Sequence, residues 1–459
     1  MKGERGEEPG GIVWTDADVR AALELAPSGE KPVMFSGVTT DSRAVSAGAL
    51  FVALSGDRFD GHDYLGTVAA AGALGAVVKR GTPAVPGLAL FEVDDTLLAL
   101  GWLARARRRR IAGPVIAITG TNGKTSTKEM LAAALRIRYA VYATRANLNN
   151  LIGVPLTILE APAAADALVV EAGASIPGEI RRARGIIEPD ITVVTNAVAG
   201  HLEGFGSLAG VIEEKLALTD RVELAIVGPD PAELAAGARQ RAKHVRTAGL
   251  RASELVPEHV VLGEDARPVM TIGGQTFTLA ARGLHQADNA VRVWAVVEAL
   301  GLDRDAAARA LERFTIPGGR GELMQVGRLT ILNDCYNANP QSFHAAIDTA
   351  RALRTGRRLV FLAGTMRELG PEGPTLHAAV ARALVELEPD LLGAVGEFVP
   401  ALEPYAARLG ERLVTAADPI ALGERLAGRL AGDEVVVLKA SRGVALERIL
   451  PALLAGVHE

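Results

Sequence analysis

The segment from Thr119 to Thr125 carries residue types that bind phosphate groups. It follows the apolar run 114–118 and precedes a helical pattern over 126–138. A glycine-rich turn between a strand and a helix offers backbone N–H groups and a helix N-terminus to an anion. In such a loop Lys124 would reach the β- and γ-phosphates, and the hydroxyl of Thr125 would bind Mg²⁺.

The spacing of this loop departs from the general P-loop pattern. Only Thr121 and Asn122 separate Gly120 from Gly123, whereas the general pattern has four residues there. An ordinary strand-to-helix turn is the alternative. The strand before the loop and the helix after it favour a nucleotide site. The residues expected to bind the phosphates are Thr119, Gly120, Thr121, Asn122, Gly123, Lys124 and Thr125.

Two further polar residues follow apolar runs of the same region. Glu171 comes directly after the run 167–170, and His201 lies in the loop beyond the run 191–195. The carboxyl ends of parallel strands face the ligand crevice. We expect both residues to lie at the ends of adjacent strands and to converge with Thr125 on phosphate-bound Mg²⁺. Taken singly, each has an ordinary alternative, a glutamate that caps a helix and a solvated loop histidine.

Three residues later in the chain have less specific patterns. Lys215 lies in the helical stretch 207–218 beside two glutamates, so spacing alone predicts a surface lysine. Asp334 ends an apolar run, and an aspartate in that place can hold a ribose hydroxyl. Cys335 is expected to be a small buried residue rather than a nucleophile, because no histidine lies close in sequence.

Apolar runs alternate with helical patterns along the chain, which predicts an α/β fold with parallel sheets covered by helices. We expect three domains: a small α/β N-terminal domain over 1–110, a central P-loop domain over 111–317, and a C-terminal Rossmann-like domain over 318–459. A hairpin with a Gly273–Gly274 turn is expected over 267–279. Further expected strands are 329–333, 359–363, 391–395 and 435–438, and further expected helices are 64–73, 97–110, 289–300 and one that starts at Pro340 with Asn339 as its cap.

Length and composition restrict the function classes. The chain has 459 residues, which agrees with about three domains. Its 49 basic and 54 acidic residues give a net charge of −5, so no nucleic-acid partner is expected. The arginine run 107–110 is read as the end of a helix, with a nucleic-acid patch as the alternative. A single cysteine excludes an internal disulfide framework and a cysteine-rich zinc site.

The N-terminus and the apolar stretches indicate where in the cell the protein is expected. The first residues are charged and no apolar signal region follows them. The stretch 68–78 is too short to span a bilayer. We therefore expect a cytoplasmic protein without a membrane segment.

Together these motifs resemble those of the Mur ligase family, over nearly the whole chain. The strings that carry the resemblance are Thr40–Arg43, Asp60–His62, Thr119–Thr125, Asn147–Asn150, Ile152–Pro155, His201–Glu203, Pro317–Gly321, Tyr336–Pro340 and Ser441–Gly443. The strings 147–150 and 336–340 are similar to those of members that join D-alanyl-D-alanine to UDP-N-acetylmuramoyl-tripeptide. The chain departs from the family pattern at Ala172, Gln286–Ala287, Thr365 and Ala440.

The resemblance implies an ATP-dependent amide ligase and a set of site residues. ATP would phosphorylate the terminal carboxylate of the tripeptide, and the amine of D-alanyl-D-alanine would displace phosphate from the acyl phosphate. By the same resemblance Thr125 and Glu171 hold one Mg²⁺, His201 helps to hold a second, and Lys215 is carbamylated on the metal side. The implied catalytic residues are Lys124, His201, Lys215 and Arg320; Asn289, Asp334 and Asn337 would contact the adenosine, Ser42 and Arg43 the uridine diphosphate, and Asn147, Asn149 and Asn150 the sugar-peptide.

Other functions stay open at this point. A folylpolyglutamate synthase or another Mur ligase would share the phosphate loop, but the strings 40–43 and 336–340 argue against them. A non-catalytic nucleotide-binding scaffold is a third hypothesis, and the presence of Glu171, His201 and Lys215 together argues against it. The expected partners are small molecules, and the expected state is a monomer.

Overall fold

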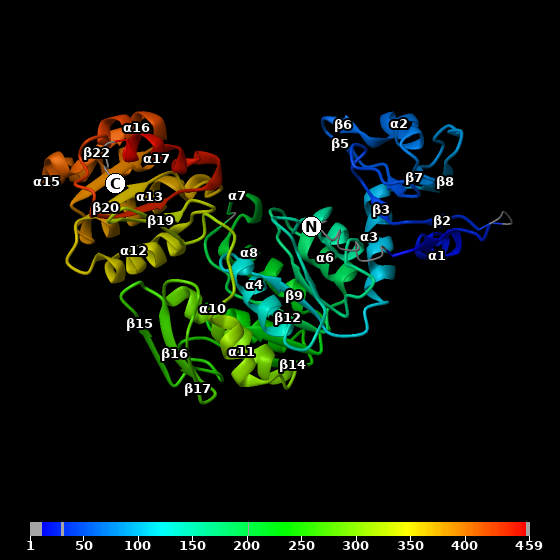
Figure 1. Ribbon diagram of the computed structural model, residues 1–459, viewed down its shortest axis with the longest axis horizontal. Helices are drawn as coiled ribbons and strands as arrows, with labels where there is room; N and C mark the ends of the chain where they lie inside the picture. The colour runs from blue at the N-terminus through cyan, green and yellow to red at the C-terminus, as the bar shows by residue number, and fades with distance from the viewer. Residues whose placement is uncertain (1–11, 29–31, 201, 456–459) are drawn as a thin grey trace, which may run out of the picture.

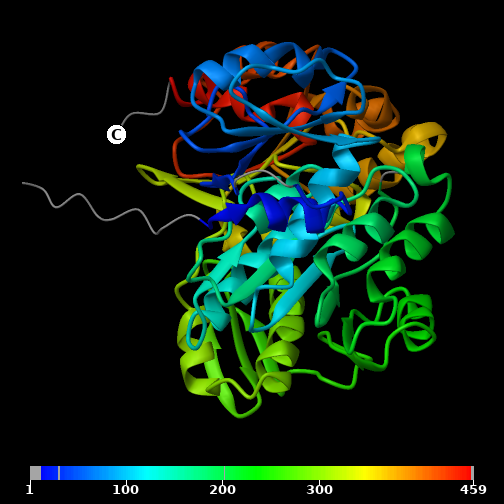
Figure 2. The same cartoon turned by 90° about the vertical axis from the view of Figure 1, so that its right-hand side faces the viewer.

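The computed structural model describes residues 12–28, 32–200 and 202–455. The chain forms three lobes (Figure 1). The N-terminal lobe and the C-terminal lobe both lie on the same side of the central lobe, and the view turned by 90° agrees with this arrangement (Figure 2). Within these residues no helix combines the length and apolarity needed to cross a membrane.

The N-terminal lobe is built on a parallel sheet of order β3-β4-β7-β8. Its strands are β3 (Val38–Thr39), β4 (Leu50–Val52), β7 (Gly75–Lys79) and β8 (Ala89–Val93). Two small antiparallel pairs join β1 (Trp14–Thr15) to β2 (Met34–Phe35) and β5 (Ser55–Gly56) to β6 (Phe59–Asp60). The helices are α1 (Asp16–Ala22), α2 (Leu65–Ala70) and α3 (Thr96–Arg108).

Helix α3 joins the N-terminal lobe to the central lobe. A methyl group on Gly101 would come within 2.9 Å of the end of the Ile186 side chain on the facing helix, so glycine lets the two helices pack closely without a shift of that side chain. The arginine run forms the C-terminal end of the helix, as predicted, and its side chains also bind residues of the central lobe. Arg109 pairs with Glu188, and Arg108 donates to the Glu188 carbonyl and to Asp190. One continuous apolar core runs through both lobes.

The central lobe holds a parallel sheet of order β10-β11-β9-β12-β13-β14. The strands are β9 (Val115–Thr119), β10 (Val141–Ala143), β11 (Ala167–Glu171), β12 (Ile191–Val194), β13 (Leu224–Val227) and β14 (His244–Thr247). The expectation that Glu171 and the loop after β12 follow adjacent strands is wrong, because β9 lies between β11 and β12. The strand order reverses at β9, where open α/β sheets form their ligand crevice. Glu171 is also the last residue of β11 rather than the residue after it.

Helices cover both faces of this sheet, and a small antiparallel sheet of order β15-β16-β17 packs beside it. The helices are α4 (Lys124–Leu135), α5 (Gly153–Leu159), α6 (Glu179–Ile187), α7 (Leu202–Phe205), α8 (Leu208–Leu216), α9 (Ala232–Arg239), α10 (Leu284–Ala299) and α11 (Arg304–Leu311). The strands are β15 (His259–Leu262), β16 (Pro268–Ile272) and β17 (Gln275–Thr278), which confirms the hairpin at Gly273–Gly274. The expected start of a helix at Asn289 is wrong, because α10 begins right after Gly283 and Asn289 lies buried in its second turn.

The C-terminal lobe is a second sheet, of order β18-β19-β23-β20-β21-β22, in which only β18 is antiparallel. The strands are β18 (Glu322–Val326), β19 (Leu329–Asp334), β20 (Leu359–Ala363), β21 (Leu391–Val395), β22 (Leu413–Ala416) and β23 (Val435–Lys439). The helices are α12 (Pro340–Arg354), α13 (Gly373–Glu386), α14 (Phe398–Leu402), α15 (Ala406–Leu409), α16 (Pro419–Leu426) and α17 (Leu450–Leu454). The predicted cap is confirmed, because Asn339 accepts the N–H of Ser342 in a capping box and Pro340 opens α12.

The sheets of the three lobes fall inside the three expected ranges. The exact boundaries at 110/111 and 317/318 stay predictions.

Candidate functional site

A cavity of about 640 Å³ opens between the central and C-terminal lobes. Its walls come from the carboxyl ends of both large sheets, as expected for α/β proteins. It brings together most of the residues that the sequence singled out. The predicted site residues in its lining are Thr121, Asn122, Gly123, Lys124, Thr125, Asn147, Asn149, Asn150, Glu171, Asn289, Arg320, Asp334 and Asn337. His201 lies outside the described residues.

The phosphate loop is held in place by the end of the neighbouring strand β12. The Asn122 N–H donates to Oδ1 of Asn196 at 3.0 Å, and the Thr195 hydroxyl donates to the Asn122 carbonyl at 2.6 Å. Gly123 has φ +81°, and a methyl group there would lie 2.6 Å from Oδ1 of Asn289. The loop therefore needs glycine at this position for its backbone and for contact with α10.

Lys124 is held by its own loop, and among the described residues it forms no ion pair with an acid. Its ammonium donates to the carbonyls of Gly120 at 2.8 Å and Thr121 at 3.1 Å. The pKa of Lys124 is lowered, mainly by burial; Glu171 opposes this shift and Arg320 adds to it. A cation that is destabilised in this way gains from an anionic ligand, which is what a triphosphate supplies.

Glu171 joins the phosphate loop to the loop before α5. Its Oε2 accepts from the Thr125 hydroxyl at 2.9 Å, and its Oε1 accepts from the Asn149 amide at 2.8 Å. The side chain is only 2% exposed, and its backbone N–H is bonded to Thr144. A carboxylate beside a hydroxyl and an amide forms an oxygen-rich group of the kind that Mg²⁺ prefers.

The described residues contain no cluster of three or more His, Cys, Asp or Glu side chains arranged for a metal ion. A Mg²⁺ ion here would therefore need oxygen ligands from outside the protein as well. Phosphate oxygens of a bound nucleotide are the usual source of such ligands.

Lys215 is buried, so the surface position suggested by spacing is wrong. It is 1% exposed, in the last turn of α8, and its Nζ lies 5.4 Å from the centre of the Phe205 ring. Burial, and to a lesser degree Lys124, lowers the pKa of Lys215 to about 7, while Glu214 and Glu179 oppose the shift. Glu214 itself accepts the N–H groups of Gly178 and Ile180 at the start of α6. Residues of α6, α7 and α8 thus enclose a lysine for which the sequence spacing predicts an exposed position.

Arg320 reaches the cavity from the loop between α11 and β18. Its guanidinium stacks on the ring of Tyr336, 3.5 Å from the ring centre. Its Nε is buried and has no hydrogen-bond partner within the described part of the chain. Stacking fixes the plane of the guanidinium and leaves N–H groups for a ligand, as suits a residue that binds phosphate.

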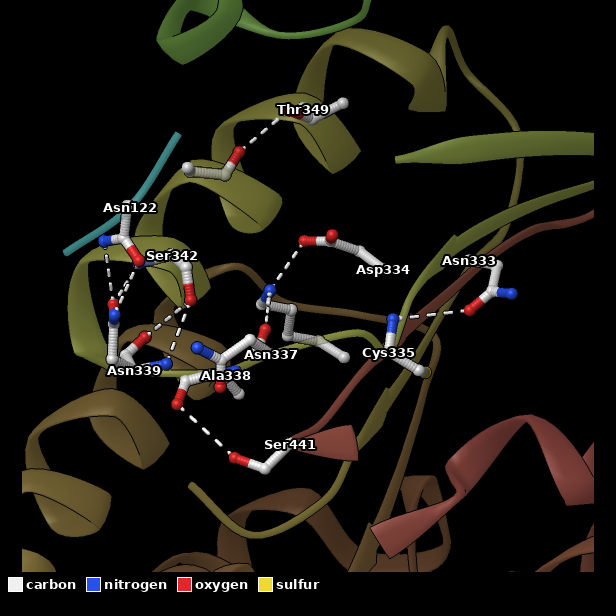
Figure 3. A network of polar contacts seen from close by, with 12 residues as sticks. Asn122, Asn333, Asp334, Cys335, Asn337, Ala338, Asn339, Ser342, Thr349 and Ser441 are labelled. Carbon is white, nitrogen blue, oxygen red and sulfur yellow. Dashed lines mark hydrogen bonds and ion pairs between the residues drawn. The ribbon is translucent and has the colours of Figure 1, made fainter. Parts of the chain in front are cut away.

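Asp334 and Lys439 form an ion pair at the carboxyl ends of two adjacent strands. Lys439 Nζ lies 2.7 Å from Oδ2 of Asp334 and donates to the Asn337 carbonyl, also at 2.7 Å. Figure 3 shows Asp334 and Asn337 on either side of these contacts. Cys335 is buried next to them, as expected, and burial raises the pKa of its thiol.

An amide link connects the two lobes across the cavity. The side chains of Asn122 and Asn339 exchange two hydrogen bonds, of 3.1 and 2.7 Å, as Figure 3 shows. The Asn122 amide also donates to Gln341 at 2.8 Å. Because Asn339 caps α12, the link fixes the start of that helix against the phosphate loop.

The N-terminal residues Ser42 and Arg43 are not brought into this cavity. Arg43 is 88% exposed in its side chain and pairs with Asp41, whose pKa it lowers to about 2. They lie in a turn that follows β3, a strand of the N-terminal lobe (Figure 1). Asn150 lines the cavity, and its Oδ1 also accepts the N–H groups of Ile152 and Gly153 at the start of α5.

Sequence reasoning missed several residues of the site. Asn196 follows the apolar run 191–195 directly, and a search for polar residues at strand ends would have found it. Lys439 likewise ends the run 435–438. Tyr336 opens the string 336–340, but nothing in the sequence indicates its stacking with Arg320, and Gln341 carries no signal, because both contacts join distant segments.

The comparisons with known proteins agree with this geometry. Three family models match: the Mur ligase middle domain over 118–297, the Mur ligase glutamate ligase domain over 319–442, and the Mur ligase family catalytic domain over 34–108. UDP-N-acetylmuramoyl-tripeptide--D-alanyl-D-alanine ligase of Escherichia coli is 34% identical over 433 residues, which cover 92% of this chain and 94% of the relative.

Solved structures of MurF ligases are also similar to this chain. A crystal structure of MurF from Acinetobacter baumannii has a TM-score of 0.87 at 28% identity, covering 97% of this chain and 99% of the other. The MurF ligase from Thermotoga maritima in complex with ADP has a TM-score of 0.80 at 27% identity, covering 92% and 97%.

Proposed function

The chain belongs to the Mur ligase family, and on that premise we propose that it is an ATP-dependent ligase that joins D-alanyl-D-alanine to UDP-N-acetylmuramoyl-tripeptide. The observation that carries the proposal is the cavity in which the phosphate loop of one lobe meets Arg320 and Asp334 of another. The similar ADP-bound ligase supports the use of ATP.

ATP is proposed to lie across the cavity. Its β- and γ-phosphates would bind the backbone of the phosphate loop and Lys124, whose burial favours an anionic partner. Arg320 would contact the γ-phosphate. Asn289, Asp334 and Asn337 are proposed to contact the adenosine, because they line the same cavity as the loop.

Thr125 and Glu171 are proposed to hold Mg²⁺ together with phosphate oxygens. Their mutual hydrogen bond and the amide of Asn149 form an oxygen-rich set that fits the ion. When bound, Mg²⁺ would neutralise part of the negative charge on the transferred phosphoryl group. His201 is proposed to help hold a second ion.

Carbamylation of Lys215 is a further part of the proposal. Its amine is buried, and both burial and the charge of Lys124 lower the pKa of Lys215, so a second ammonium is disfavoured there. Reaction with carbon dioxide would replace that cation by a carbamate anion, which suits the metal side of the site. We expect Lys215→Ala to be nearly inactive and to regain part of its activity with short carboxylic acids. An unmodified amine in a high-resolution map of active enzyme would contradict carbamylation.

The proposed reaction has two steps. An oxygen of the tripeptide's terminal carboxylate attacks the γ-phosphorus, which gives an acyl phosphate and ADP. The amine of D-alanyl-D-alanine then attacks the acyl carbon, loses a proton and releases phosphate as the amide forms. Lys124 and Arg320 would stabilise negative charge on the phosphoryl group in the first step. Ser42 and Arg43 are proposed to bind the uridine diphosphate, and Asn147, Asn149 and Asn150 the sugar-peptide.

Phosphate release tests the proposal directly. Purified protein is given ATP, Mg²⁺, UDP-N-acetylmuramoyl-tripeptide and D-alanyl-D-alanine, and each is omitted in turn. We expect release that needs every component, with the pentapeptide product identified by mass spectrometry. ATP binding without release in the complete mixture would contradict the proposal. The cytoplasmic location and the monomeric state stay predictions.

A further inference from the structure

Lys439 is a buried cation inside the cavity that no step of the proposed reaction uses. It is only 2% exposed and ends β23, the strand next to β19. In the parallel ladder Lys439 is the register partner of Asp334, so the two side chains leave neighbouring strands side by side. Burying a lysine is costly unless its charge is paired, which gives this pair a reason to form.

The contacts of Lys439 connect two groups that line the cavity. Its ammonium holds Oδ2 of Asp334 and the carbonyl of Asn337, each at 2.7 Å. The next polar residue of the same segment, Ser441, reaches the Ala338 carbonyl at 3.5 Å. The residues at the end of β23 therefore hold the loop 335–339 through two of its backbone carbonyls. Figure 3 shows these contacts between Asp334 and Ser441.

The pairing leaves one face of Asp334 for a ligand. Oδ1 of Asp334 accepts no hydrogen bond from the described residues, and the side chain of Asp334 is 24% exposed. Lys439 thus fixes the orientation of the carboxylate through one oxygen. It also neutralises the carboxylate's charge, which suits an uncharged sugar hydroxyl better than a phosphate.

We propose that Lys439 is a positioning residue for the nucleoside, which holds Asp334 and Asn337 so that the free oxygen of Asp334 accepts a ribose hydroxyl. The inference rests on the proposed use of ATP. It assigns Lys439 no contact with the nucleotide itself. Loss of Lys439 should therefore remove selectivity for the ribose rather than catalysis in general.

The test compares ATP with 2′-deoxy-ATP and 3′-deoxy-ATP as substrates, by kcat/KM for phosphate release. We expect the wild type to prefer ATP by about tenfold over at least one analogue, as for one hydrogen bond to a charged group. Lys439→Gln and Asp334→Asn should each bring that preference close to one. The double variant, which leaves neither charge unpaired, should show no further change. Lys439→Arg should restore part of the preference.

A matched control separates positioning from stability. Glu434 is a fully buried carboxylate just before the opposite end of β23, paired with Arg358. We expect Glu434→Gln to lower the melting temperature while the ATP preference stays at its wild-type value. Melting temperatures of the Lys439 variants show which of them are folded.

Two outcomes overturn the inference. One is a Lys439→Gln enzyme that loses activity equally for all three nucleotides and keeps the wild-type preference. The other is a wild type that does not discriminate among them. If the wild type releases no phosphate at all, the proposed ligase reaction fails instead. Calorimetric binding of the same three nucleotides to the same variants then decides the role of Lys439 by itself.

Discussion

The two large sheets each bring an acid and a lysine to their carboxyl ends, but they arrange the charges differently. In the central lobe, Lys124 bonds to backbone carbonyls and Glu171 bonds to a hydroxyl and an amide. In the C-terminal lobe, Asp334 and Lys439 pair directly. No ion pair of the described residues joins Lys124 to Glu171.

The difference indicates which part of a nucleotide each sheet serves. Charges that are bonded only to neutral groups keep their attraction for a phosphate or a metal ion. A paired acid and lysine have no net charge and offer a fixed hydrogen-bonding geometry instead. The same two residue types thus suit the triphosphate in one lobe and the nucleoside in the other.

The strongest test of this comparison removes the positive charge of Lys124. We expect Lys124→Met to lower the rate of ATP-dependent phosphate release by about a hundred- to a thousandfold, because the charge that meets the triphosphate is lost. Circular dichroism should show an intact fold. Lys243→Met, an exposed lysine of the same lobe, is the control and should leave the rate unchanged. Near-normal turnover of Lys124→Met would remove the basis of the comparison.

A second test removes the free anion. Glu171→Gln keeps a similar shape and can still bond to Thr125 and Asn149, but it has no charge for a cation. We expect about a ten- to hundredfold higher Mg²⁺ concentration for half-maximal activity. A titration of phosphate release with Mg²⁺ measures this shift. An unchanged Mg²⁺ requirement would mean that Glu171 serves only to hold the two loops together.

A third test breaks the link between the two regions. Asn122→Ala removes the hydrogen bonds to Asn339 and Gln341 across the cavity. We expect about a five- to tenfold loss in kcat/KM for ATP, because the two sets of charges are no longer held together. Gln341→Ala removes one of these bonds and should have a smaller effect. Equal losses in both variants would show that the paired asparagines are not the important contact.

The smallest expected effect concerns acid stability of the C-terminal lobe. His377 is buried, accepts the Met366 N–H through Nε2 and bonds to the Gly373 carbonyl through Nδ1. Burial lowers its pKa below the ordinary 6.5, so the folded state resists a proton that the unfolded state accepts. Stability from His377 is therefore complete above about pH 6.5 and is lost as the pH falls below that value.

Glutamine can make both hydrogen bonds of His377 without taking up a proton. We expect the melting temperature of His377→Gln to fall less than that of the wild type between pH 7 and pH 5, by a few degrees at most. Parallel curves for the two proteins would show that His377 does not titrate in this range.

The parts of the site that are contiguous in sequence could be predicted. The phosphate loop and its flanking elements lie within 115–135, so local pattern alone identifies them. The cap at Asn339 is equally local. Short strands such as β10, whose residues are only half-buried, lack the apolar run that would have revealed them.

The parts that depend on tertiary packing could not be predicted. Nothing near Lys215 in sequence indicates that α7 and α6 cover it. The order of strands in the central sheet depends on tertiary packing and not on any one segment. The sequence therefore predicts that Glu171 and the loop after β12 follow adjacent strands, whereas β9 lies between those strands. Lys439 meets Asp334 only because β19 and β23, about a hundred residues apart, are adjacent in the sheet.

The contacts of α3 with the central lobe determine where the N-terminal segment can be exchanged for that of another protein. Arg108 and Arg109 hold the backbone and side chains of 188–190, and Gly101 fits against Ile186. A donor N-terminal segment spliced in at residue 110 would bring an α3 shaped for a different surface. A splice before Asp95, the residue that caps α3, leaves this helix with the lobe it fits. The natural junction for exchanging parts is therefore the loop before α3, not the end of the sequence-defined domain.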